Sequence, residues 1–120
     1  MSAFADLGDI APIAIWEHVL ARLVSGDECS LAVVELDPES VVAEHSHPNE
    51  QLGLVVRGSV RFRVGNEERE LGPGGTWNIR PNVPHEVHTG PDGAVVIDVF
   101  SPPRDDWRAL DRMSPQPHRL

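Results

Sequence analysis

The sequence predicts an all-β protein, a sandwich or barrel of short strands. The 120 residues include 10 Gly and 11 Pro, which are spread evenly along the chain and divide it into short apolar segments. Such punctuation favours strands over helices, and the short, regular spacing is typical of sandwiches and barrels. Hydrophobic residues make up 40% and charged residues 24%, which is ordinary for a chain with one core. We expect a single domain over residues 1–120, with its core at about 13–107 and a tail at 108–120.

Each predicted strand is an apolar or alternating run that ends where Gly, Pro, Asn or Asp can turn the backbone. In chain order, the predicted strands span residues 13–24, 30–36, 41–47, 51–56, 60–64, 67–71, 76–79, 85–89 and 94–100. The predicted turns lie at residues 25–27, 37–39, 48–50, 57–58, 65–66, 72–75, 81–82 and 90–93. After the last strand, residues 105–112 favour a short helical turn. Pro115 and Pro117 then predict an extended, frayed end.

Two predicted strands, 51–56 and 94–100, are apolar on both faces: they read Gln-Leu-Gly-Leu-Val-Val and Ala-Val-Val-Ile-Asp-Val-Phe. A strand of this kind is usually covered on both sides, by a second sheet or by another subunit. The pattern therefore predicts a layered fold and favours a homodimer.

The charge of the chain excludes several classes of function. Ten basic residues, all Arg, stand against 19 acidic ones, and the formal net charge is −9. Nucleic acids and anionic membranes bind basic surfaces, so neither is an expected partner. An anionic substrate would need Arg side chains or a metal ion to reverse the field locally. Cys29 is the only cysteine, so no internal disulfide is expected. Residues 1–10 lack a signal-peptide pattern and no apolar run reaches the ~18 residues of a membrane span, which predicts a cytoplasmic protein.

The segment Glu44-His45-Ser46-His47-Pro48-Asn49-Glu50-Gln51 carries the strongest chemical signal. Residues two apart in a strand point to the same side, so His45 and His47 offer half of a site for a divalent ion. Gln51 has the same parity and Glu50 the opposite one. His-x-His alone is a weak signal, because a single histidine is more often a surface or core residue than a ligand.

A further candidate ligand is His85, which follows the rigid turn Pro81-Asn82-Val83-Pro84. Prolines fix the backbone direction, which suits a ligand that must arrive at a set angle. We assign structural roles to the remaining histidines, His18, His88 and His118.

These two segments resemble the two motifs of the cupin superfamily. The first motif has His-x-His, an acidic residue shortly after, and a closing glycine, which corresponds here to His45, His47, Gln51 and Gly58. The second has a glycine, five residues, Pro-x-Gly, two residues and a histidine. Gly74 and His85 fit it, whereas Arg80 and Asn82 replace the Pro and the Gly; Asn tolerates the left-handed backbone that Gly would supply. The resemblance implies a cupin jelly-roll barrel, also called a double-stranded β-helix.

The first motif has a glutamine where most cupins have a glutamate. In this respect the sequence resembles the small cupins of the pectin-degradation KdgF family. This resemblance implies one divalent transition metal (Zn, Ni, Mn, Fe or Co) held by His45, His47, Gln51 and His85. The family also uses an Asp, a Phe and an Arg at the spacing of Asp98, Phe100 and Arg104. Such endings are common among small cupins of other activities as well.

The residue chemistry leaves alternatives open at these three positions. Asp98 stands in an apolar strand, where a carboxylate is costly unless paired. It is either a general acid/base beside the metal or the partner of an arginine, with Arg61, Arg63 and Arg80 as the candidates. Arg104 either clamps a substrate carboxylate or forms a surface salt bridge with Asp105 or Asp106. Phe100 either lines the substrate site or packs in the core. The remaining candidates for substrate binding are Trp77 and Arg80. Arg61 and Arg63 are further candidates, but a strand face that points to solvent explains their matching parity equally well.

The function that the resemblance implies is ketonisation of 4,5-unsaturated uronates, the products of pectin and alginate lyases, to linear 5-keto sugars. Two alternatives stay open, because one fold hosts many chemistries. One is another metal enzyme acting on a small acid, such as a dioxygenase, lyase or isomerase. The other is a sugar-binding cupin without catalysis.

Overall fold

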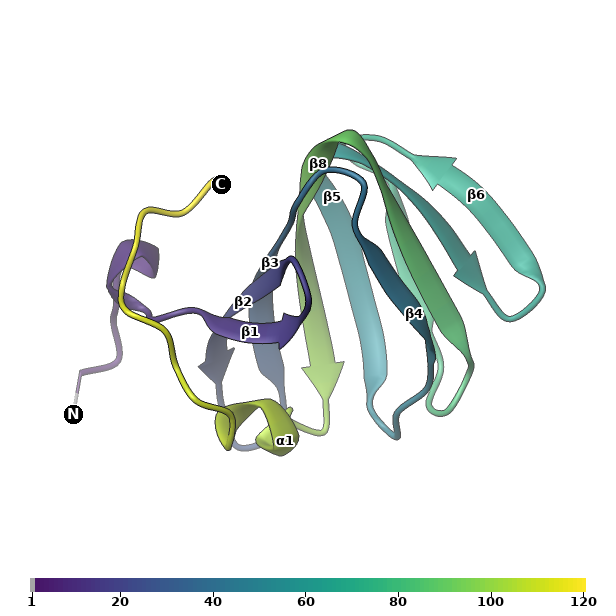
Figure 1. Ribbon diagram of the computed structural model, residues 1–120. Coiled ribbons are helices and arrows are strands. Elements are labelled where there is room, and N and C mark those ends of the chain that lie inside the picture. Colours follow the sequence, from purple (N-terminus) through teal and green to yellow (C-terminus); the bar gives the residue numbers. More distant parts are fainter. Residues whose placement is uncertain (1) are drawn as a thin grey trace.

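The computed structural model describes residues 2–120 as a barrel of antiparallel strands with little helix (Figure 1). The elements are η1 (Leu7–Asp9), β1 (Ile13–Trp16), β2 (Val19–Ser25), β3 (Ser30–Leu36), β4 (Val41–His45), β5 (Glu50–Val64), β6 (Glu67–Leu71), β7 (Thr76–Ile79), β8 (His85–Ser101) and α1 (Asp105–Arg108). The predicted all-β class is confirmed, and so is a short helical turn after the last strand.

The two long strands β5 and β8 pair with each other along most of their length and belong to both layers of the barrel. One layer has the order β1-β2-β3-β8-β5-β7 and the other the order β4-β8-β5-β6. Both long strands bend at the same level, where the β5 register shifts on either side of Gly58; Figure 1 shows β8 curving over this end. Gly58 and Gly93 have φ values of 77° and 72° there, and a Cβ on Gly58 would overlap the carbonyl oxygen of Gly93. Glycine is therefore needed where the strands turn.

This corner corrects two predicted boundaries. Residues 57–58 and 90–93 were expected to separate strands, but they lie inside β5 and β8. Glycines in these segments bend the strand without ending it.

A third correction concerns residues 13–24, which form the two strands β1 and β2 rather than one. The chain reverses at Glu17 and His18, where His18 has a φ of 65°. Neither residue is a typical turn former, so the apolar run concealed the turn.

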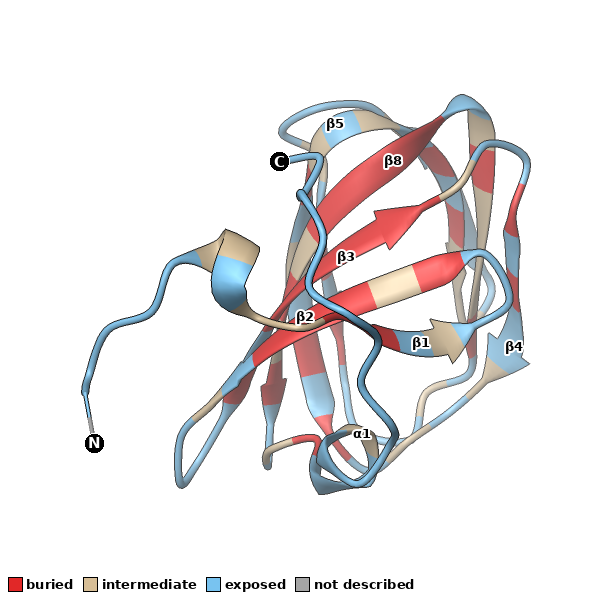
Figure 2. Cartoon of the chain, turned by 60° about the vertical axis from the view of Figure 1, so that its left-hand side comes forward, coloured by how far each residue is buried: buried red, intermediate tan, exposed pale blue. Residues whose placement is uncertain are grey.

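Side chains that alternate inward from the layers fill the barrel. On β8, Ala94, Val96, Asp98 and Phe100 are all at most 6% exposed, as the expected alternation requires. Figure 2 shows buried residues concentrated along β2, β3 and β8. Apolar side chains line most of the interior, and the buried polar residues Gln51, His85, Asp98 and Arg104 share one cavity.

The outer face of β2 and β3 holds a buried ion pair beneath the C-terminal segment. Arg22 Nη1 donates to both carboxylate oxygens of Glu35, at 2.8 and 2.9 Å, and Nη2 donates to the carbonyl oxygens of Gln116 and Pro117. Figure 2 shows the segment crossing this face. The end of the chain is extended, as predicted, and two of its carbonyl oxygens accept hydrogen bonds from the Arg22 side chain; its fraying stays a prediction.

Arg22→Ala is expected to destabilise the fold by about 3–5 kcal/mol, because it leaves the Glu35 carboxylate buried without its partner. The control is Arg57→Ala. Arg57 also donates to a tail carbonyl, that of Arg119, but it does so at an exposed position. Urea unfolding followed by circular dichroism measures both variants, and equal losses of stability would contradict the role of the buried pair.

Four apolar residues, Val24, Leu31, Val99 and Leu52, lie side by side across the outer face of β2, β3, β8 and β5. Val24, Leu31 and Leu52 are each at least 40% exposed. The homodimer stays a prediction, which light scattering on the purified protein tests. Among residues 2–120, neither helix has the length and apolar character to cross a membrane.

Candidate metal centre

Three histidines meet at one end of the barrel. His45 ends β4 and lies opposite His85, the first residue of β8, in the antiparallel register. His47 follows in the loop before β5. One ligand atom from each ring lies within 4.8 Å of the others, and the ring centroids of His45 and His85 are 4.3 Å apart. The structure thus brings the three predicted histidines together.

Backbone carbonyls orient all three rings in the same manner. The Nδ1 atoms of His45, His47 and His85 lie 2.8, 3.0 and 2.9 Å from the carbonyl oxygens of Ala43, Asn49 and Val83. A carbonyl oxygen only accepts, so each Nδ1 carries the proton and each Nε2 keeps a lone pair. This arrangement is typical of the second shell of metal sites, where it fixes the tautomer of the ligand.

The side chain of Gln51 adds an oxygen to the three ring nitrogens. Its Nε2 donates to Asp98 Oδ1 at 2.9 Å, so its Oε1 is the atom that faces His47 Nε2, at 3.0 Å. Both of these facing atoms are acceptors when His47 is neutral. Burial is the main cause that lowers the pKa of His47, and the charge of Arg104 adds to it. A cation between the two acceptors would satisfy both.

The unpartnered Nε2 atom and the neutral ring of His85 are also consistent with a metal ligand. Its Nε2 atom is buried and has no hydrogen-bond partner among residues 2–120, an arrangement that is costly without a ligand. Burial lowers the pKa of this ring to about 4, so it is neutral and able to bind metal at pH 7. Three imidazoles and one amide oxygen suit a divalent transition metal, and these neutral ligands do not compensate its charge.

Asp98 lies directly behind Gln51 and is 6% exposed. Its Oδ1 accepts hydrogen bonds from Gln51 Nε2 and, at 2.8 Å, from Trp77 Nε1; neither bond uses Oδ2. Burial raises the pKa of Asp98 to about 6, although the two hydrogen bonds and the charge of Arg104 act in the opposite direction. The group is thus poised to exchange a proton near neutral pH.

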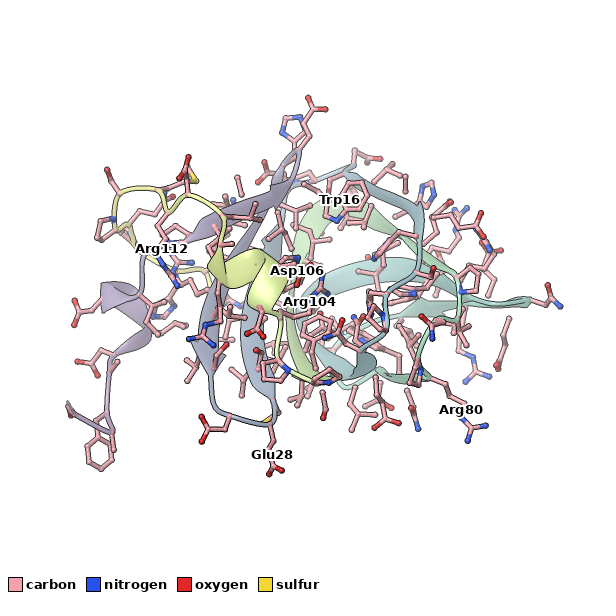
Figure 3. All side chains as sticks on the ribbon, turned by 90° about the horizontal axis from the view of Figure 1, so that it is seen from below. Trp16, Glu28, Arg80, Arg104, Asp106 and Arg112 are labelled. Carbon is pink, nitrogen blue, oxygen red and sulfur yellow. The ribbon has the colours of Figure 1, made fainter. Side chains whose placement is uncertain are left out.

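The alternative that Asp98 pairs with an arginine of a neighbouring strand is wrong. Arg63 pairs instead with Glu86 and Glu44 on the outer face. Arg80 is exposed, because Trp77 and Ile79 take the inward positions on and near β7, and Figure 3 shows Arg80 pointing away from the barrel. Arg80 therefore does not join the other predicted substrate-binding residues. Trp77 lines the cavity, where its indole N–H is committed to Asp98.

The sequence reasoning missed Gly53, which lies opposite both Trp77 and Asp98 in the sheet. A Cβ at this position would overlap Trp77 Nε1 and Asp98 Oδ1. The available signal was a glycine in the middle of an apolar strand, which often marks a close approach of another group.

Gly53→Ala is expected to destabilise the protein by about 1–3 kcal/mol through overpacking and to displace Trp77 from Asp98. The matched control is Gly72→Ala, where an added Cβ meets nothing within 4 Å. Thermal unfolding measures the loss of stability, and the change in tryptophan fluorescence reports the displacement of Trp77. If the two alanine variants have the same thermal stability and the same tryptophan fluorescence, Gly53 is not tightly packed against Trp77 and Asp98.

Arg104 lies at the mouth of the site, immediately before α1, and is 6% exposed. Its guanidinium carbon is 4.7 Å from the ring centroid of Phe100 and 3.8 Å from that of Trp107. It donates from Nε and Nη2 to the two carboxylate oxygens of Asp106, at 3.0 and 2.9 Å. The predicted pairing with Asp105 or Asp106 therefore occurs with Asp106, but from a buried guanidinium rather than a surface one.

The cavity in front of these residues has a volume of about 60 Å³ and is partly open to solvent. Polar atoms on its walls come from His45, His85, Gln51, Asp98, Trp77 and Arg104. Aliphatic and aromatic side chains form the rest of the lining, with Phe100 and Trp107 beside Arg104. Phe100 both packs in the core and lines the cavity, so the two interpretations of this residue are compatible.

Comparisons with known proteins agree with this architecture. The family model described as "Cupin domain" matches residues 32–100. The pectin degradation protein KdgF of Dickeya dadantii (strain 3937) is 29% identical over 82 residues, which cover 68% of this chain and 74% of that protein. The structure of KdgF from Halomonas sp. aligns with a TM-score of 0.80 and 25% identity, over 88% of this chain and 98% of that one. An RmlC-like cupin from Shewanella frigidimarina NCIMB 400 aligns with a TM-score of 0.81 and 23% identity, over 88% and 96% of the two chains, and supports the fold alone.

Proposed function

Because the chain belongs to the cupin family, we propose that it is a metal-dependent enzyme that opens and ketonises 4,5-unsaturated uronates. One observation carries the proposal: Gln51 links the histidine cluster to a buried carboxylate, because its Oε1 faces His47 Nε2 and its Nε2 donates to Asp98. The distant relationship to a pectin degradation protein supports the substrate class.

The reaction is an isomerisation, so atoms and electrons balance without a co-reactant. The proton leaves the anomeric hydroxyl, the bond between C1 and the ring oxygen breaks, and an aldehyde and a C5 enolate form. A proton then adds to C4 and gives the linear 5-keto sugar. A divalent ion bound by His45, His47, Gln51 and His85 would supply Lewis-acid stabilisation of the negative charge.

The side chains of the chain handle the protons and the substrate carboxylate. Asp98 accepts the anomeric proton on Oδ2, the oxygen that Gln51 and Trp77 leave unused, and returns a proton to C4. Gln51 and Trp77 hold this carboxylate in place. Arg104 binds the substrate carboxylate, whose negative charge the −9 chain would otherwise repel. The apolar walls keep bulk water away from the enolate.

The test follows the ultraviolet absorbance of 4,5-unsaturated monouronate, prepared by lyase digestion of polygalacturonate. The conjugated C4=C5 carboxylate absorbs, and the linear ketone does not. The sugar also opens slowly on its own, so the measurement is acceleration over that background. We expect wild type to accelerate the decay and a variant carrying both His45→Ala and His47→Ala to leave it unchanged. A metal-loaded wild type that does not accelerate the decay would overturn the proposal.

The predominantly apolar lining favours a second candidate, a metal enzyme acting on a small carboxylic acid with an apolar body. A lyase or isomerase of this kind would use the same carboxylate and arginine, whereas a dioxygenase would consume oxygen with Fe(II). Oxygen uptake separates the dioxygenase from the other two. Tight uronate binding without turnover would instead indicate a sugar-binding cupin.

A further inference from the structure

The exposed carboxylate of Asp106 contacts the buried guanidinium of Arg104 at the mouth of the cavity, and its function is not explained by the reaction above. The side chain of Asp106 is 63% exposed, whereas the side chain of Arg104 is 7% exposed. Figure 3 shows the two residues side by side at the start of α1. Asp106 compensates the buried charge of Arg104, and the geometry of the contact points to a second role.

The contact occupies one particular edge of the guanidinium. Arginine offers five N–H groups in a rigid plane. Asp106 accepts from Nε and from one hydrogen of Nη2. Three N–H groups remain, and the end-on edge formed by Nη1 and Nη2 can still bind a carboxylate through two parallel hydrogen bonds.

Two aromatic rings fix the plane of the same guanidinium. Phe100 and Trp107 meet nearly at right angles, with an interplanar angle of 77° and centroids 5.0 Å apart. Arg104 lies against both rings. The rings restrict its tilt, and Asp106 restricts its rotation within the plane. Its hydrogen bonds with Arg104 hold the pKa of Asp106 below its ordinary value, so Asp106 is an anion at neutral pH.

We propose that Asp106 is a positioning residue, which holds Arg104 so that the end-on edge of the guanidinium faces a carboxylate in the cavity. Asp106 approaches from the solvent side, while Arg104 lines the cavity. The carboxylate in question is that of the uronate, so this inference rests on the proposed function. The new element is that binding of the uronate carboxylate by Arg104 depends on Asp106, which does not touch the substrate.

The test compares Asp106→Ala with Asp106→Glu and with the control Asp105→Ala. Asp105 is a suitable control because it is the adjacent acidic residue in the same turn and pairs with Arg108, away from the cavity. The probe is D-galacturonate, a saturated uronate that cannot react, and its Kd is measured by NMR titration of the protein. We expect Asp106→Ala to weaken binding about tenfold, as for loss of an oriented charge-assisted contact, and Asp106→Glu to restore most of it. Asp105→Ala should bind like wild type.

A second readout does not depend on any ligand. The Nε–H proton of an arginine held by a carboxylate exchanges slowly with water and is visible by NMR. We expect such a signal from Arg104, assigned by its loss in Arg104→Lys, to disappear in Asp106→Ala and to persist in Asp105→Ala. In turnover assays, Asp106→Ala should raise KM more than it lowers kcat.

The outcomes separate the two claims. Persistence of the Arg104 signal in Asp106→Ala, or equal galacturonate binding by the two alanine variants, overturns the positioning role. Wild type that does not bind galacturonate overturns it as well. If galacturonate binding and the signal behave as expected but unsaturated uronate is not turned over, the proposed function fails and the positioning role stands.

Discussion

Replacing Asp98 by asparagine is expected to lower kcat on unsaturated uronate by about three orders of magnitude, within the range that general acid–base groups supply, while fold and metal content stay unchanged. Asparagine keeps an Oδ1 atom that accepts from both Gln51 and Trp77. It cannot take up the anomeric proton. Steady-state kinetics, metal analysis and circular dichroism measure the three quantities.

The control is Asp92→Asn, which changes an exposed aspartate of the same strand. Its activity should match that of wild type. If Asp98→Asn retains at least half of the wild-type kcat, Asp98 is not the base.

The same variant also has an expected effect on the stability of the metal-free protein. Burial raises the pKa of Asp98 from 3.8 to about 6. Between these values the folded state binds more protons than the unfolded state, so stability falls as the pH rises through this window. Metal-free Asp98→Asn should therefore resist urea better than metal-free wild type at pH 7, and the difference should close as the pH falls below 3.8.

His85→Ala is the second change with a large expected effect: metal content and uronate turnover should both be lost. It removes the ligand atom that is buried without another partner, and a site reduced to two imidazoles and an amide holds a divalent ion weakly. Elemental analysis after dialysis measures the metal bound per chain. Because this ring is buried against Phe62, circular dichroism checks that the variant is folded.

His88→Ala provides the comparison, because His88 lies three residues along the same strand and bonds to Glu86 on the outer face. It should keep both metal and activity. A metal content for His85→Ala that equals that of His88→Ala would place the metal elsewhere. Treatment of wild type with a chelator should reproduce the loss of activity, and adding the ion back should reverse it.

The candidate ligands could be predicted because they match the two motifs that the sequence shares with the cupin superfamily. The parity argument alone would not have sufficed, because the strand predicted over residues 41–47 ends at His45, which leaves His47 in a loop and Gln51 in the next strand. The hydrogen-bond partners of Asp98 could not be predicted in this way. The donors to Asp98 come from β5 and β7, and only the register of the sheet shows that Gln51 and Trp77, rather than an arginine, reach it.

The fold shows the same limit. Local rules locate a residue that can turn the chain, but they do not say whether the strand ends there. Gly58 and Gly93 bend paired strands because the strands continue across the corner. The reversal at His18 has no glycine or proline to mark it. Both cases depend on pairing partners that are distant in sequence.

The C-terminal segment has a consequence for how this protein can change over evolution and in the laboratory. Arg22 and Arg57 bind it through main-chain oxygens of Gln116, Pro117 and Arg119, and every amino acid supplies such an oxygen. Selection on these contacts therefore preserves the length and path of the segment rather than its residue types. A comparison scored on residue types will therefore undervalue this segment. Library designs can randomise these side chains but should not shorten the segment.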